Sequence, residues 1–177
     1  MYRSLKLFAL TTFLAFLLTS QLTSCASSVQ HSVSDYQYQG EKFRAVTVTV
    51  TPELEHGLRD TDFNTDTMTK SIIHQLRKQQ LWDETTGSSL QVHVDDVRIR
   101  SLMTALIFAF FAGDDHIKGD VTIFDPAQNP QHTFRVSTSF AMGGLFNTQG
   151  DVRWEWLYQA FAEQITLGIV QGANKRL

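Results

Sequence analysis

The sequence predicts an α+β fold: a two-layer sandwich in the order β-α-β-β-β-α, with a mixed four-stranded sheet and both helices on one face. Three patterns support this prediction. Residues 43–51 alternate Val with Thr over most of their length, which is typical of a strand with one buried face. Residues 151–169 repeat bulky apolar side chains at steps of three and four, as an amphipathic helix does. Two further alternating segments flank a short turn at 125–130, which indicates an antiparallel hairpin.

The first strand is expected at 43–51, and Pro52 ends it because proline cannot donate to a strand ladder. Residues 52–65 are rich in acidic side chains and are expected to form a loop. A helix is expected over 67–81, where an apolar stripe is followed by basic residues near the C-terminal end. Since this helix is a crossover connection, the first two strands are expected to be parallel.

The second strand, expected at 90–100, changes phase midway. Its apolar residues are even-numbered before the change and odd-numbered after it: Leu90, Val92 and Val94, then Val97 and Ile99. Asp95 and Asp96 lie at the change, so we expect a β-bulge there. His93 and these two aspartates are conceivable metal ligands or acid–base groups, but a polar outer face with a bulge explains them more simply.

The last two strands are expected at 117–124 and 132–140, and the final helix at 151–169. This helix should lie across the sheet and cover its core face. Its apolar stripe consists of Trp154, Leu157, Tyr158, Phe161, Ile165 and Ile169.

A second apolar stretch, Leu102–Ala112, contains Thr104 as its single polar residue. It is too short to span a bilayer as a helix, which needs about 20 residues. Two interpretations stay open: a buried part of the core, or an apolar loop offered to a partner or a membrane. In the second case the candidate contact residues are Leu102, Leu106, Phe108, Phe110 and Phe111.

The N-terminal segment has the pattern of a secretory signal peptide. Arg3 and Lys6 precede an apolar run of 12 residues at 7–18, which is shorter than a spanning helix. The single cysteine of the chain, Cys25, follows this run after six further residues. We therefore expect a signal peptide at 1–24, a polar, flexible tether at 25–40 and a single α+β domain at 41–177.

The residues Leu22-Thr23-Ser24-Cys25 resemble the lipobox of bacterial lipoproteins. This resemblance implies that Cys25 becomes the first residue of the mature chain and carries acyl chains, which would anchor it in a membrane. Ala26 is not the aspartate that often signals retention in the inner membrane. The resemblance therefore favours the outer membrane, with the domain facing the periplasm.

The domain itself is similar to bacterial lipoproteins of unknown-function families. The matching pieces are Gly119–Asp125, Gly143-Gly144 and the helix at 151–169. The layout also resembles the periplasmic αβ domain of curli-secretion and Tol-associated envelope proteins, although this chain lacks the long hairpin insertions with which a secretion lipoprotein builds a membrane barrel. The resemblance implies no catalytic residue.

Composition narrows the possible functions. Of the 15 Lys and Arg residues, Arg3 and Lys6 lie in the leader, so the mature chain carries 13 against 18 Asp and Glu. This balance argues against nucleic acid as a partner. One cysteine excludes an internal disulfide and a cysteine zinc cluster.

These observations favour a non-enzymatic envelope protein, anchored through Cys25, that binds a protein partner or assists the assembly of an envelope complex. We expect neither a metal nor a cofactor. The alternative is the handling of a lipid or apolar ligand through Leu102–Ala112. An envelope hydrolase that uses His93, Asp95, Asp96 or His116 is a weaker hypothesis, because no G-x-S-x-G elbow and no helical His pair occur.

Overall fold

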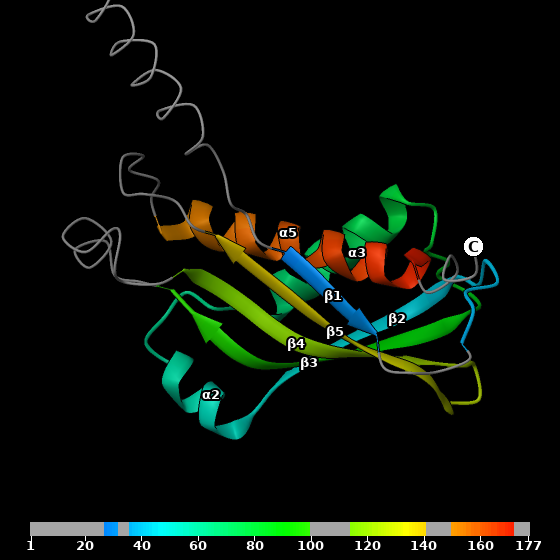
Figure 1. Cartoon of the computed structure of the whole chain (residues 1–177), viewed down its shortest axis with the longest axis horizontal. Coiled ribbons are helices and arrows are strands. Elements are labelled where there is room, and N and C mark those ends of the chain that lie inside the picture. The colour runs from blue at the N-terminus through cyan, green and yellow to red at the C-terminus, as the bar shows by residue number, and fades with distance from the viewer. Residues whose placement is uncertain (1–26, 32–35, 100–113, 141–149, 172–177) are drawn as a thin grey trace, which may run out of the picture.

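The computed structural model describes residues 27–31, 36–99, 114–140 and 150–171. They form one five-stranded sheet, in the order β1-β5-β4-β3-β2, and three helices (Figure 1). In chain order the elements are β1 (Ser27–His31), β2 (Phe43–Val50), α2 (Pro52–Leu58), α3 (Thr65–Lys78), β3 (Ser88–Arg98), β4 (Asp115–Phe124), β5 (Pro130–Phe140) and α5 (Gly150–Gln171).

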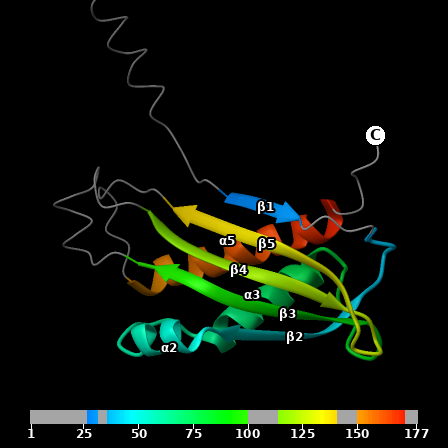
Figure 2. The same ribbon diagram turned by 60° about the horizontal axis from the view of Figure 1, so that its bottom comes forward.

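The fold has two layers, with α3 and α5 side by side over one face of the sheet (Figures 1 and 2). The strands β2 and β3 are parallel, as the α3 crossover requires, and all other neighbouring pairs are antiparallel. The predicted α+β class, the parallel first pair and the hairpin of β4 and β5 are therefore confirmed.

The prediction of four strands was wrong, because the segment 25–40, which we expected to be a tether, contributes β1 to the edge of the sheet. This strand pairs antiparallel with β5, and Val29 lies opposite Val136. The sequence of β1, Ser-Ser-Val-Gln-His, is short and contains one apolar residue. The strand forms because β5 offers it an edge to pair with. Its own sequence therefore needs no strong strand pattern and shows almost none.

The prediction of two helices was also wrong, because α2 lies in the acidic stretch that we expected to be a loop. The Thr51 side chain accepts a hydrogen bond from the Leu54 N–H, and Pro52 occupies the first turn. Both features are typical of a helix start. The Thr51-Pro52 pair that ends the strand therefore also begins a helix.

The β-bulge predicted in β3 is present between Val94 and Asp96. It places two successive residues, Asp95 and Asp96, toward the face that no described helix covers. The bulge also returns Val97 to the core face, where it lies opposite the buried Ile117. The phase change in the sequence thus reflects one continuous apolar face.

The core lies between the sheet and the two long helices. All six residues of the predicted α5 stripe are buried, and Met68, Ile72 and Leu76 of α3 are fully buried opposite them. In the described part of the chain, no helix is long and apolar enough to cross a membrane.

Candidate functional site

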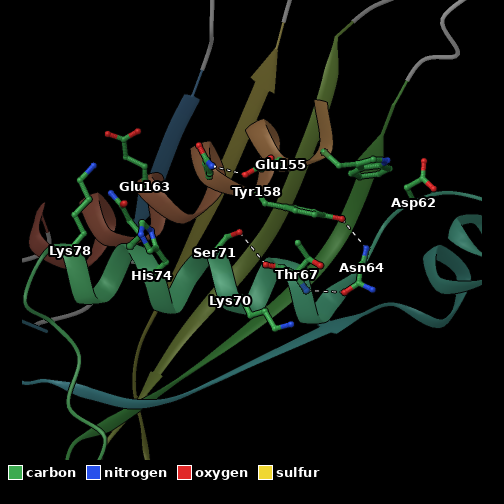
Figure 3. Close-up of a pocket in the computed structure, with 13 residues that line it drawn as sticks. Asp62, Asn64, Thr67, Lys70, Ser71, His74, Lys78, Glu155, Tyr158 and Glu163 are labelled. Carbon is green, nitrogen blue, oxygen red and sulfur yellow. Dashed lines mark hydrogen bonds between the residues drawn. The ribbon is translucent and has the colours of Figure 1, made fainter. Parts of the chain in front are cut away.

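An open groove runs along the helix layer between α3 and α5, with a volume of about 680 Å³. Figure 3 shows the side chains that line it. We call it the helix groove. Its lining residues from α3 and the preceding loop are Asp62, Asn64, Thr67, Lys70, Ser71, His74, Gln75 and Lys78, and those from α5 are Trp154, Glu155, Tyr158, Gln159 and Glu163.

The helical period explains why these side chains share one groove. On α3, Lys70, His74 and Lys78 recur at steps of four, beside the buried stripe of the same helix. On α5, Glu155 and Glu163 lie eight residues apart, which returns them to the same side of the helix. The packing of the two helices then brings these polar sides together.

The two walls of the helix groove carry opposite charge. The α3 wall presents the basic side chains of Lys70, His74 and Lys78, and the α5 wall presents the carboxylates of Glu155 and Glu163. All five of these residues are exposed to solvent. A ligand of one charge sign would therefore meet attraction on one wall and repulsion on the other, whereas a polypeptide with both signs fits both walls.

One end of the helix groove is aromatic. The rings of Trp154 and Tyr158 stack with centroids 5.7 Å apart, and Phe63 meets each of them edge-on at 5.6 and 5.9 Å. The Tyr158 hydroxyl oxygen accepts a hydrogen bond of 2.8 Å from the Asn64 N–H (Figure 3). Because Asn64 is also the N-cap of α3, this bond fixes the start of α3 to α5.

Burial raises the pKa of Tyr158 to about 12, with a further rise from the charge of Asp62 and an opposing effect of the Asn64 N–H. The phenol therefore stays protonated at neutral pH. Ser71 donates its hydroxyl proton to the Thr67 carbonyl oxygen at 3.0 Å, so this proton is directed at the backbone of α3 and not at His74.

The structure places His93, Asp95, Asp96 and His116 on the opposite face of the sheet, away from the helix groove. Asp95 pairs with Arg135, and Asp96 pairs with Lys118 at 2.7 Å. The His116 Nε2 lies 3.0 Å from Asp96, and the His93 Nδ1 lies 3.1 Å from the Thr49 hydroxyl. These side chains form cross-strand pairs on an open sheet face, as the polar-face interpretation predicts.

No three His, Cys, Asp or Glu side chains gather into a possible metal site within the described residues. Cys25, the predicted lipid-attachment residue, lies outside the described residues. So does the whole candidate contact stretch, with Leu102, Leu106, Phe108, Phe110 and Phe111. Both assignments stay predictions.

The helix groove was not found from the sequence. Its signal in the sequence is the recurrence of polar residues at steps of three and four on each helix. A period shows which residues share a face of one helix, but it does not show which two helices lie side by side.

No protein-family model matches the sequence, and no curated protein matches it either. Among solved structures, the PelC dodecamer from Paraburkholderia phytofirmans is similar over 82% of this chain and 98% of that chain, with 10% identity and a TM-score of 0.49. A minor lipoprotein from Acinetobacter baumannii is similar over 75% of this chain and 95% of that chain, with 14% identity and a TM-score of 0.38. Likenesses this low do not establish a shared function.

Proposed function

We propose that this chain is a lipid-anchored protein of the bacterial cell envelope that binds a protein partner through the helix groove. The support for anchoring is the sequence Leu22-Thr23-Ser24-Cys25, in which the single cysteine stands where a lipobox requires it. Because Ala26 follows, the proposed location is the outer membrane, with the domain on its periplasmic side.

The observation that carries the binding proposal is the opposed charge of the two groove walls next to an aromatic end. Fatty acyl chains would leave the charged walls of the helix groove without partners, which costs free energy. A nucleic acid would be repelled by Glu155 and Glu163. A protein segment can place acidic residues on Lys70 and Lys78, basic residues on the glutamates, and an apolar side chain near Trp154.

Anchoring is tested by growth with radiolabelled palmitate. We expect the wild-type chain to take up label and to fractionate with outer membranes, and we expect Cys25→Ala to lose the label and to leave the outer-membrane fraction. A Cys25→Ala chain that still fractionates with outer membranes without label would contradict lipid anchoring.

Partner binding is tested separately, by photocrosslinking in intact envelopes. A photoreactive amino acid at position 71, in the helix groove, should give a discrete protein adduct, and the same amino acid at the exposed position 85 should not. Lys70→Glu should abolish the adduct. Lys42→Glu makes the same change of net charge outside the groove, so it should leave the adduct intact. Equal adducts at positions 71 and 85 would contradict a role of the groove.

A further inference from the structure

The outer edge of β2 pairs with no other described strand. The sheet ends at β2, and its one neighbour is the parallel strand β3, so no described strand pairs with its other side (Figure 2). The Thr51 N–H donates to the Val94 carbonyl of β3 at 3.2 Å. Along a parallel strand, the main-chain N–H and C=O groups of alternate residues point to the same neighbour. Those of Thr47 and Thr49 therefore point to β3, as the N–H of Thr51 does. The main-chain groups of Val46, Val48 and Val50 therefore point away from β3.

Beyond Arg44 at its start, this edge lacks the features that normally protect an edge strand. Natural proteins blunt such edges with charged side chains, proline or bulges. Residues 45–51 contain no charged residue and no proline, and alternate Val with Thr. The one irregularity in the pairing of β2 lies at its start, between Phe43 and Ala45.

At its first residue, the same edge already accepts a partner from within the chain. The Phe43 N–H donates to the Leu81 carbonyl at 2.8 Å, and the Phe43 carbonyl accepts from the Asp83 N–H at 2.9 Å. This contact is a parallel bridge between Phe43 and Trp82. An extended segment can thus approach this edge without steric conflict at one end, and further along the edge no described residue pairs with it.

A hollow of about 520 Å³ adjoins the other end of this edge, where β2, α2 and the start of α3 meet. Its apolar lining includes Val48, Val50, Leu58 and Phe63. Val48 and Val50 lie opposite buried residues of β3, so their side chains are on the helix-covered face of the sheet. A strand added at this edge would direct alternate side chains to that same face, toward the hollow.

The hollow favours a basic side chain at that position. Glu55 and Asp66 line it, with Arg59 as the opposing charge. Across residues 53–66 there are five carboxylates, and Arg59 is the one Lys or Arg residue. A Lys or Arg side chain can lay its aliphatic part on Val48 and Leu58 and bring its charge to these carboxylates.

We propose that the outer edge of β2 binds an extended segment of another protein by β-strand addition, and that a Lys or Arg of that segment enters the hollow beside Glu55 and Asp66. Main-chain hydrogen bonds to Val46, Val48 and Val50 provide affinity, and the hollow provides specificity. This surface is separate from the helix groove, and the proposal does not depend on the groove binding a partner.

The first test is amide hydrogen exchange of the full chain, measured by NMR. In the free protein the amides of Val46, Val48 and Val50 should exchange at least about 100-fold faster than those of Thr47 and Thr49, which face β3. The probe is a ten-residue peptide that alternates Val and Thr, with Arg in place of one central Val. Saturating peptide should slow the hydrogen exchange of the three valine amides about tenfold or more.

Three variants separate backbone pairing from side-chain effects. Val48→Pro removes one outward N–H and leaves the β3 ladder intact, whereas Val48→Ala keeps that N–H. We expect Val48→Pro to bind the peptide about tenfold more weakly than Val48→Ala. The double variant Glu55→Gln/Asp66→Asn changes no backbone group. It should bind the Arg peptide about fivefold more weakly than the wild type does, and it should bind a Gln-containing peptide with unchanged affinity. This pair of peptides keeps the test valid if Val48→Pro does not fold.

Two results would overturn the proposal. The first is protection of the three valine amides in the free protein, because the edge is then already covered by the chain itself or, if the measured mass is that of a dimer, by a second copy. The second is a peptide that leaves these amides unprotected, or that binds Val48→Pro and Val48→Ala equally.

Discussion

Arg135 on β5 forms a bidentate ion pair with Asp95 on β3, across the intervening strand β4. The two contacts, Nη1 to Oδ2 and Nη2 to Oδ1, are both 2.8 Å long. Asp120 on β4 accepts a third bond from Nη1 at 3.1 Å. The bulge between Val94 and Asp96 makes this possible, because it leaves Asp95 outside the regular pairing with β4. One guanidinium thus ties three strands together on the open face.

The first prediction concerns this cluster. Asp95→Asn should lower the free energy of unfolding by about 1 kcal/mol, because a bidentate charged pair is lost, but its two side chains are 36% and 30% exposed and solvent screening keeps the loss small. Asp120→Asn should cost less, since it removes a single longer contact. Urea denaturation of both variants measures the difference. Equal losses, or a larger loss for Asp120→Asn, would show that the bidentate pair is not the main contact.

The bulge also shows how far the sequence can predict this fold. The phase change at Asp95 and Asp96 was visible because apolar side chains mark the core face of a strand on both sides of it. The partner of Asp95 was not visible, because Arg135 lies 40 residues further along the chain. Cross-strand pairs depend on register, and register requires knowledge of which strands are neighbours.

The elements that the sequence did not predict are those that depend on contacts with other elements more than on an apolar pattern of their own. The strand β1 is polar and gains its order from the edge of β5, whereas the buried stripe of α5 is visible in its own period. The helix α2 has no fully buried residue, and its apolar stripe consists of Leu54 and Leu58 alone, which is too short to distinguish a helix from a loop. The helix groove requires α3 and α5 to be neighbours, which neither helix encodes alone.

The second prediction concerns the ion pair of Arg153 with Asp115, which ties α5 to the start of β4. Both side chains are largely withdrawn from solvent, with exposed fractions of 12% and 2%. Arg153→Met should lower the free energy of unfolding by about 3 kcal/mol, because it leaves the Asp115 carboxylate buried without this cation. Arg153→Lys keeps the charge and should cost less. Chemical denaturation tests both variants. If Arg153→Met is as stable as the wild type, other contacts of Asp115 are enough to stabilise its buried carboxylate.

The third prediction concerns Gly168, where α5 packs closely on β5. A Cβ atom at this position would lie 2.4 Å from Cε2 of the buried Phe134 ring. Gly168→Ala should therefore lower the melting temperature, at a cost of about 1–3 kcal/mol for overpacking. Gly57→Ala is the matched control, because a Cβ there meets no atom within 4 Å. Since Gly57 lies in α2, alanine should stabilise that helix slightly. A Gly168→Ala chain as stable as Gly57→Ala would show that the Phe134 ring moves aside at no cost.

The fourth prediction is a pH dependence that arises from Asp96. The hydrogen bond from Lys118 holds the pKa of Asp96 below its usual range, burial opposes this, and His116 lowers the pKa further. The pKa is thus lower in the folded chain than in the unfolded chain. Its stabilising effect is therefore fully present above the unfolded value, about 4, and is lost as the pH falls through the folded value.

Urea unfolding at pH 5.5 and at pH 3 or below, for the wild type and for Asp96→Asn, measures this effect. At pH 5.5 the wild type should be more stable by less than about 1 kcal/mol, because the Asp96 side chain is 44% exposed and solvent screens the pair. This advantage should shrink at the lower pH, where protonated Asp96 resembles asparagine. Lys118→Met removes the main hydrogen bond, so in that background Asp96→Asn should have a smaller effect at pH 5.5. An advantage that persists undiminished at low pH would mean that Asp96 stabilises the sheet through its shape and not through its charge.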